Sequence, residues 1–329
     1  MSATAAKQFA LIGASGYVAP RHMRAIRDVG GNLKAVLDPA DSIGAIDSYF
    51  PDARFFLEFE RFDRHIDKLR RSGERIDYVS ICSPNYLHDA HVRFALRSDA
   101  DAICEKPLVL NPWNIDGLAE IEQSTDRKVN TILQLRLHPT IIGLKNKVEN
   151  GARDRISDVD LTYITSRGRW YYVSWKGDEQ KSGGVATNIG IHFYDMLSFV
   201  FGPLETNYVH HRAVDCAAGY LSYKKARVRW FLSINRKDLP ANVPPGQTTF
   251  RSIVIDGEEL EFSDGFTDLH TRSYQQILGG NGFSLHDVRP SVETVSYIRS
   301  ASLEPSKGEQ HPFLSGALTA SRYRNGFPV

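Results

Sequence analysis

Lys106 lies in the stretch AICEKPL, residues 102–108, between an acid and a proline at the end of an apolar run. A lysine withdrawn from water has its pKa lowered and can exchange a proton near neutral pH. Successive side chains of a strand point to opposite faces, so Glu105 and Lys106 cannot both enter one site. The stretch alone also fits an ordinary surface lysine at a strand end, with Glu105 turned toward a ligand or a structural partner.

A second candidate proton-handling group lies in NIGIHFYDML, residues 188–197. Asn188, His192 and Asp195 are spaced i, i+4 and i+7, which places them on one face of a helix. His192 titrates in the physiological range, and Asp195 is placed to orient it. The alternative is a histidine that serves only the core of an amphipathic helix.

A glycine turn, GASGYVAP at residues 13–20, directly follows the first apolar run. Gly13, Gly16 and Ala19 form a GxxGxxA pattern, one residue longer than the usual GxGxxG. Such a turn lets backbone N–H groups approach a pyrophosphate at a helix N-terminus. We therefore predict cofactor contacts from Gly13, Ser15, Gly16 and Tyr17, although a plain strand-to-helix turn would have the same composition.

Asp38 closes the second apolar run, about 20 residues further on, where a carboxylate can accept the ribose hydroxyls of a dinucleotide. It would repel a 2′-phosphate, so the pattern favours NAD over NADP. The alternative is an aspartate that merely ends a strand before Pro39.

Further cofactor contacts are predicted where later strands end. SPNYLH, residues 83–88, follows the fourth apolar run, and its Ser83 and Asn85 fit a helix cap as well as the wall of a cofactor groove. The predicted cofactor contacts here are Ser83, Pro84, Asn85, His88, Glu105, Lys106 and, from an expected sixth strand, Gln134.

The elements that carry these residues alternate from residue 8 to about residue 150. Short apolar runs are separated by segments with helical spacing, which predicts a doubly wound parallel sheet of the Rossmann type. From about residue 157 long alternating runs predict a mostly antiparallel sheet, interrupted by one helix at ATNIGIHFYDMLSFVFG. We predict an α/β domain at 1–136 and an α+β domain for substrate binding and oligomerisation at 137–329, whose C-terminal helix could pack back on the first.

Composition narrows the class of protein. The 329 residues contain 40 basic and 39 acidic side chains, which gives no electrostatic footprint for nucleic acid. No apolar stretch is long enough to span a bilayer, and the N-terminus lacks signal-peptide features. Cys82, Cys104 and Cys216 have no metal-ligand spacing, so we expect reduced cysteines, no metal site and a cytoplasmic protein.

The glycine turn, Asp38, SPNYLH, EKP and GGVATNIGIHFYDML together resemble the Gfo/Idh/MocA oxidoreductase family over essentially the whole chain. The resemblance implies an NAD-dependent enzyme that acts on a carbon bearing a hydroxyl, with the lysine of EKP beside the nicotinamide. Where the wider family usually has an aspartate, this chain has Asn188. A general base cannot be assigned to that position, and the acid/base work is expected of Lys106 and His192.

Longer runs, among them VDLTYITSRGRWYYVSWKGD and FTDLHTRSYQQIL, resemble one group within the family. This resemblance implies oxidation of the C3 hydroxyl of a UDP-N-acetylglucosaminuronate in O-antigen and lipopolysaccharide biosynthesis. It also implies a downstream PLP aminotransferase, possible recycling of NADH by 2-oxoglutarate, and a homodimer or tetramer. Another sugar or inositol dehydrogenase, and an NAD-sensing protein without turnover, are the alternatives.

An anionic nucleotide sugar requires cations and an aromatic platform, which the segment at residues 166–181 supplies. Arginine binds carboxylate or phosphate through two bonds, and an aromatic ring can stack on uracil. The alternative is a half-exposed strand with ordinary aromatic residues. The predicted substrate contacts are Lys106, Arg136, Arg167, Trp170, Tyr171, Trp175, Lys176, Asn188 and His192.

Overall fold

The computed structural model describes residues 6–41, 44–261, 266, 268–319, 323–324 and 327–328. The chain divides into two compact units. The first comprises residues 1–137 and 265–289, and the second comprises 138–264 and 290–329. The boundary expected at 136/137 thus falls at 137/138, and the chain returns to the first unit near its C-terminal end.

The first unit contains a six-stranded parallel sheet, as predicted. The strand order is β3-β2-β1-β4-β5-β6, the doubly wound order in which ligands bind beyond the carboxyl ends of the strands. The strands are β1 (Gln8–Ile12), β2 (Asn32–Leu37), β3 (Arg54–Phe56), β4 (Tyr78–Ile81), β5 (Asp101–Cys104) and β6 (Val129–Thr131).

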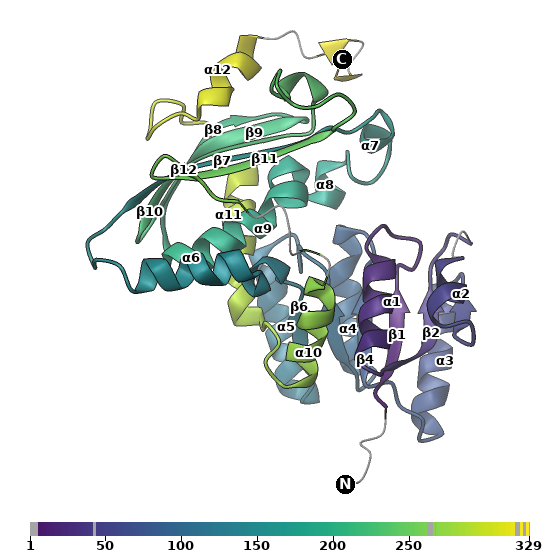
Figure 1. Ribbon diagram of the computed structural model, residues 1–329. Helices are drawn as coiled ribbons and strands as arrows, with labels where there is room; N and C mark the ends of the chain where they lie inside the picture. The colour runs from purple at the N-terminus through teal and green to yellow at the C-terminus, as the bar shows by residue number, and fades with distance from the viewer. Residues whose placement is uncertain are drawn as a thin grey trace. The chain divides into compact units, whose positions relative to one another are not determined.

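Helices cover both faces of this sheet, with α1 and α2 on one face and α3, α4 and α5 on the other (Figure 1). In α3, Phe62 and Ile66 are one turn apart and buried, while its charged residues lie outside. The helical elements are α1 (Ala19–Asp28), α2 (Ala45–Tyr49), α3 (Phe59–Arg71), η1 (Asn85–Leu87), α4 (His88–Arg97), α5 (Pro112–Thr125), η2 (Gln134–Leu137) and α10 (Leu269–Leu278).

Two features of the first unit differ from expectation. Gln134 and Arg136 lie in the 3₁₀ helix η2, because β6 ends at Thr131. The segment 269–278, for which no element was predicted, forms α10 and packs against α1 and η2. This helix therefore brings residues from far along the chain to the first unit.

The second unit is built on a six-stranded sheet of order β12-β11-β7-β10-β9-β8. All its pairings are antiparallel except that of β7 with β10, which is parallel. The mostly antiparallel sheet was predicted. Its strands are β7 (Ser157–Thr165), β8 (Leu204–Arg212), β9 (Cys216–Tyr223), β10 (Ala226–Ser233), β11 (Thr249–Ile255) and β12 (Glu258–Glu259).

One face of this sheet packs on α9 (Gly184–Phe201), the helix predicted there. Tyr194 of α9 meets Trp230 of β10 edge to face, and both side chains are fully buried. The other helices are α6 (Pro139–Glu149), α7 (Trp170–Val173), α8 (Glu179–Ser182), η3 (Arg236–Asp238) and α12 (Pro312–Thr319), followed by β13 (Tyr323–Arg324) and β14 (Phe327–Pro328). The predicted C-terminal helix is α11 (Leu285–Ser300), of which residues 285–289 belong to the first unit.

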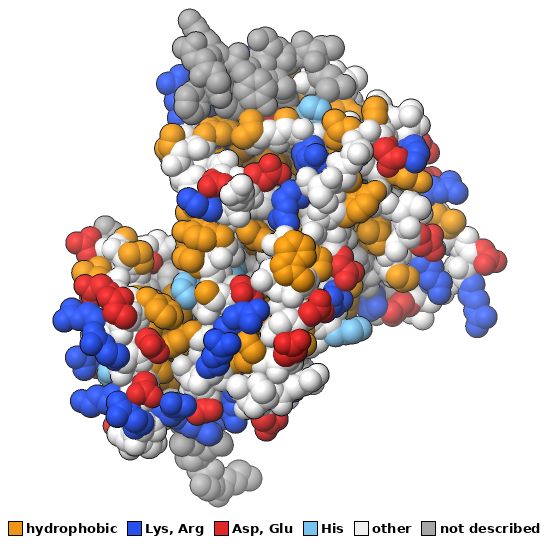
Figure 2. All heavy atoms as spheres, turned by 180° about the vertical axis from the view of Figure 1, so that it is seen from behind, with side chains coloured by type: hydrophobic (Ala, Val, Ile, Leu, Met, Phe, Trp, Pro, Cys, Tyr) orange, Lys and Arg blue, Asp and Glu red, His pale blue; other side chains and the backbone are white. Residues whose placement is uncertain are grey.

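The surface agrees with the near-zero net charge. On the face shown in Figure 2, Lys and Arg side chains are interspersed with Asp and Glu. The three cysteines are free and buried. Within the described residues, every helix is too short or too polar to cross a bilayer.

Candidate active site

The glycine turn connects β1 to α1 in a conformation that requires glycine at Gly13. Its φ is +92°, and a Cβ added there would lie 2.5 Å from the backbone nitrogen of Ser83. The Gly13 N–H donates to the Leu37 carbonyl at 2.8 Å. The turn is thus pressed against the chain that leaves β4. Within it, Tyr17 is 85% exposed, and the Arg21 guanidinium lies 5.3 Å from its ring centroid.

Asp38 is buried at the end of β2 and binds the glycine turn directly. Its Oδ2 accepts the Ser15 N–H at 2.8 Å, and its Oδ1 accepts the Ala40 N–H at 2.8 Å. The carboxylate therefore stands beside the turn, where the sequence predicted it. Each oxygen keeps lone-pair capacity for a ligand hydroxyl, so a structural anchor and a ribose acceptor can be the same group.

The segment after β4 is held by two buried histidines. Ser83 Oγ lies 2.8 Å from His91 Nδ1, so the hydroxyl pairs with a side chain of α4, whose own N-cap is Leu87 without a side-chain bond. His88 Nε2 lies 2.7 Å from the Ser83 carbonyl, and His88 Nδ1 lies 2.7 Å from the Pro107 carbonyl. His88 thereby ties the chain after β4 to the chain after β5.

Lys106 follows β5 and is partly exposed, and its peptide bond to Pro107 is cis. Burial lowers the pKa of Lys106, the Glu105 carboxylate acts in the opposite direction, and Arg21 adds to the lowering. The direction agrees with the expectation for a lysine withdrawn from water. A neutral amine at Lys106 is therefore accessible at lower pH than for an ordinary lysine.

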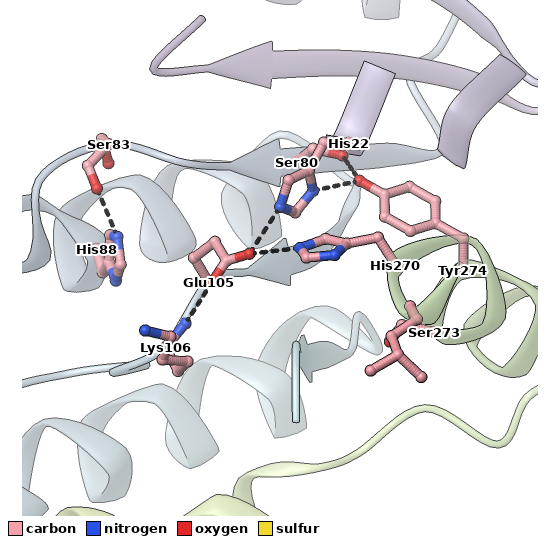
Figure 3. A network of polar contacts seen from close by, with 10 residues as sticks. His22, Ser80, Ser83, His88, Glu105, Lys106, His270, Ser273 and Tyr274 are labelled. Carbon is pink, nitrogen blue, oxygen red and sulfur yellow. Dashed lines mark hydrogen bonds and ion pairs between the residues drawn. The ribbon is translucent and has the colours of Figure 1, made fainter. Parts of the chain in front are cut away.

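The Glu105 carboxylate meets structural partners in a buried cluster, one of the two possibilities left open by the sequence, and its contact with the cofactor stays a prediction. Its Oε1 lies 3.0 Å from His22 Nε2 and 2.9 Å from His270 Nε2 (Figure 3). The donor atoms of the three residues lie within 4.8 Å of one another, and these residue types could also hold a metal ion. Sequence reasoning missed His270 and Tyr274, although their i, i+4 spacing was a readable signal.

Arg136 makes structural contacts within the first unit. Its guanidinium donates to the Asp287 carbonyl at 2.7 Å and to Asp287 Oδ1 at 3.3 Å, and it lies over the Phe283 ring. The side chain is buried. Gln134, at the start of the same 3₁₀ helix, is partly buried.

In the second unit, α9 carries the predicted trio. Asn188 and His192 are partly exposed, and Asp195 is buried. The Asn188 amide donates to the Tyr171 hydroxyl at 2.7 Å, and this bond links α9 to the preceding segment. Burial raises the pKa of Tyr171, so its hydroxyl keeps its proton at neutral pH.

The cationic and aromatic segment consists of the short helix α7, turns and the start of α8, so the strand considered for it is wrong. Tyr171 points inward from α7, while Trp170 is 54% exposed. The Lys176 ammonium lies 4.2 Å from the Trp175 ring centroid, a cation–π contact. Arg167 is exposed. The segment thus presents an aromatic and cationic surface beside a buried tyrosine.

Comparison with known proteins defines the class of this protein. The model of the oxidoreductase family's NAD-binding Rossmann fold matches residues 7–132, and that of its C-terminal α/β domain matches residues 145–239. The chain belongs to the Gfo/Idh/MocA oxidoreductase family, and its first unit is the family's NAD-binding domain.

Among solved structures, the chain is similar to the WlbA (WbpB) dehydrogenase from Thermus thermophilus. In complex with NAD and alpha-ketoglutarate, that protein is 50% identical with a TM-score of 0.90, covering 93% of this chain and 99% of that chain. Its complex with NAD and UDP-GlcNAcA gives 49% identity and a TM-score of 0.89 over the same shares.

Curated relatives match over shorter stretches. The inositol 2-dehydrogenase of Rhizobium meliloti is 28% identical over 59% of this chain and 55% of its own length. The D-glucoside 3-dehydrogenase of Escherichia coli is 29% identical over 38% of this chain and 36% of its own length. The chain therefore spans about a third to a half of these relatives.

Proposed function

We propose that this protein is a UDP-N-acetyl-2-amino-2-deoxyglucuronate dehydrogenase, which oxidises the C3 hydroxyl of UDP-N-acetyl-D-glucosaminuronate (UDP-GlcNAcA) to the 3-keto sugar with NAD. The observation that carries the proposal is the likeness to the Thermus thermophilus dehydrogenase, at 49% identity and a TM-score of 0.89, in a complex that contains NAD and UDP-GlcNAcA. The neutral amine that burial favours at Lys106 is the base that such an oxidation needs.

The cofactor, when bound, accepts the hydride from the sugar carbon. The backbone N–H groups of the glycine turn, which Asp38 holds, would bind the pyrophosphate of NAD, and Asp38 would also accept the ribose hydroxyls. Ser83 to Asn85 and His88 would support the wall of the cofactor groove, and Gln134 would line its nicotinamide side. Lys106 takes the hydroxyl proton, and His192, which Asp195 orients, is the second acid/base residue.

The substrate contacts are proposed on the exposed side of the second unit's aromatic segment. Arg167 and Lys176 bind the anionic groups, while Trp170 and Trp175 supply apolar surface. Asn188 acts together with Tyr171, to which it is hydrogen bonded. Arg136, which pairs with Asp287, is assigned to holding η2.

The wider setting is also part of the proposal. The alpha-ketoglutarate in the Thermus thermophilus complex supports recycling of NADH in place by 2-oxoglutarate. The product, a 3-keto sugar, suits a PLP aminotransferase as the next enzyme in O-antigen or lipopolysaccharide synthesis. We propose a cytoplasmic homodimer or tetramer.

A substrate panel tests the proposal. With NAD present, UDP-GlcNAcA should bind and produce NADH, whereas free inositols and hexoses should not. Turnover of inositol alone would favour the second candidate, which the Rhizobium meliloti relative supports. NAD binding without turnover of any sugar would favour an NAD-sensing protein.

Lys106→Ala tests the assignment of the base. Turnover should fall by about 10²-fold or more, because the proton acceptor is lost, while NAD affinity should change little. Lys128→Ala, at an exposed lysine of the same unit, is the matched control and should leave turnover unchanged. Wild-type turnover in Lys106→Ala would refute the role of the lysine.

A further inference from the structure

Glu105 is a buried carboxylate whose hydrogen bonds come from three separate parts of the first unit. Oε1 accepts from His22 of α1 and His270 of α10, at 3.0 and 2.9 Å. Oε2 accepts the backbone N–H of Lys106 at 3.2 Å. The carboxylate thus links two buried histidines to the residue that carries the proposed base.

The proton positions in this cluster follow from the donors available. If His22 donates from Nε2 to Glu105, its neutral ring accepts at Nδ1 from the Tyr274 hydroxyl, 2.8 Å away. The Tyr274 oxygen can in turn accept from Ser80 Oγ at 2.6 Å. Each hydroxyl or N–H donor in the chain from Ser80 through Tyr274 and His22 to Glu105 then has an acceptor. The chain carries one negative charge, which resides on Glu105.

The pKa shifts of Glu105, His22 and Tyr274 agree with this arrangement. Burial alone would raise the pKa of Glu105, but its hydrogen bonds and electrostatic interactions with His22 and His270 together hold that pKa well below its usual value. Burial lowers the pKa of His22 and raises that of Tyr274 well above its usual value. Glu105 is therefore a fixed anion, and burial favours the neutral forms of His22 and Tyr274 beside it.

The chain on the other side of Lys106 is fixed as well. The carbonyl of Pro107 lies 2.7 Å from His88 Nδ1, and the second nitrogen of that ring contacts the Ser83 carbonyl. Lys106 is therefore flanked by two residues whose polar groups are held by buried histidines, and its backbone has little freedom to move.

We infer that His22 and His270 are positioning residues for Lys106, which act by holding Glu105 as a fixed anion beside the lysine. The inference rests on the proposed role of Lys106 as the base. It assigns a function to α10, which supplies His270 and Tyr274 from a part of the chain that follows most of the second unit.

The three residues could instead ligate a divalent metal. Both Nε2 atoms, however, lie at N–H···O distances from the same oxygen, and a metal would need both nitrogens without their protons. A second positive charge beside Lys106 would also be unfavourable in a buried site. The hydrogen-bonded cluster accounts for these contacts without a metal.

The charge of Glu105 gives the inference a measurable consequence. Removing it lowers the pKa of Lys106 further, because Glu105 is the group that raises that pKa. Several titratable and charged groups face Glu105 and Lys106. They are Arg21 and His22 of α1, Cys82 after β4, His88 of α4, Cys104 of β5, and His270 and Tyr274 of α10. None of these groups supplies the lost negative charge near neutral pH.

Glu105→Gln, which preserves the shape of the side chain, is the primary test. Since the neutral amine is the active form, the limb of the kcat profile that rises with pH should move to lower pH by about one unit. Its kcat should fall about tenfold or more through loss of positioning, with KM for UDP-GlcNAcA nearly unchanged. A limb that stays at the wild-type pH would overturn the inference, even if the variant is less stable.

The histidine variants keep the test decisive if Glu105→Gln does not fold. His270→Leu removes one donor and should lower kcat, whereas His270→Gln keeps an N–H donor and should recover most of it. The proton NMR spectrum of the wild type should contain downfield imidazole N–H resonances, and one of these resonances should be absent in His270→Leu. Equal kcat values in the two variants, or one zinc per chain in the purified wild type, would overturn the inference.

Failure of this inference is distinguishable from failure of the proposed function. Full turnover in Lys106→Ala would refute both the assignment of Lys106 as the base and the positioning role of the histidines. Loss of turnover in Lys106→Ala combined with an unmoved pH limb in Glu105→Gln would leave the proposed function standing and remove only the role of the histidines.

Discussion

Gly13→Ala is expected to disrupt the cofactor turn through two effects that can be separated. Alanine in the left-handed region costs about 1–2 kcal/mol. The new Cβ would also lie 2.5 Å from Ser83 N and 2.6 Å from Cys82 C, both backbone atoms that cannot rotate away. Overpacking of this kind adds about 1–3 kcal/mol, so the free energy of unfolding should fall by about 2–5 kcal/mol.

Gly30→Ala is the matched control, because Gly30 has a φ of +72° and nothing within 4 Å of an added Cβ. The free energy of unfolding of this variant should fall only by the backbone conformational cost, about 1–2 kcal/mol, and its affinity for NAD should not change. Urea unfolding and calorimetric titration with NAD measure both quantities. Gly13→Ala should bind NAD at least about tenfold more weakly, a loss of about 1.4 kcal/mol. Equal stability and equal NAD affinity in the two variants would refute the reasoning.

Three further predictions concern specificity, pH and the core. Asp38→Ala should lower the affinity for NAD more than the affinity for NADP in calorimetric titrations. An equal loss of the two affinities would mean that Asp38 only anchors the turn through Ser15 and Ala40. Burial lowers the pKa of His311 from 6.5 to about 4, so its contribution to stability is full above pH 6.5 and is lost as pH falls toward 4, by about 3 kcal/mol. His311→Gln should shrink that loss, as measured by urea unfolding at several pH values; an unchanged pH dependence would contradict the assignment. Trp230→Ala should destabilise the second unit by about 3–5 kcal/mol in the same assay, whereas Trp113→Ala, at a side chain that is 65% exposed, should cost little. Similar losses in the two tryptophan variants would be inconsistent with the packing of α9 on β10.

The parallel sheet and the place of Lys106 were predictable because their signals are local. β1, β4 and β5 are short apolar runs, and β5 ends directly before Glu105 and Lys106. The helix α9 was predictable for the same reason, since its apolar residues repeat within one segment. Asp38 was found beside the glycine turn because strand order alone brings the ends of β1 and β2 together.

The partners of Glu105 could not be predicted in this way. His22 and His270 are 83 and 165 residues away along the chain, and no local pattern joins them to EKP. The 3₁₀ helix at Gln134 was not predicted either, because an apolar run fits a strand and a buried turn equally well. In the aromatic segment, Tyr171 is fixed by tertiary contact with Asn188, and this contact outweighs the strand propensity of its neighbours.

Transfer of deuterium from the sugar to the cofactor tests whether this enzyme moves a hydride from C3 of UDP-GlcNAcA to NAD. UDP-GlcNAcA carrying deuterium at C3 is mixed with the enzyme and NAD, and the NADH formed is isolated and analysed by mass spectrometry and NMR. We predict deuterium at nicotinamide C4 and a 3-keto sugar in equal amount. Unlabelled NADH, or no NADH from this substrate, would contradict it.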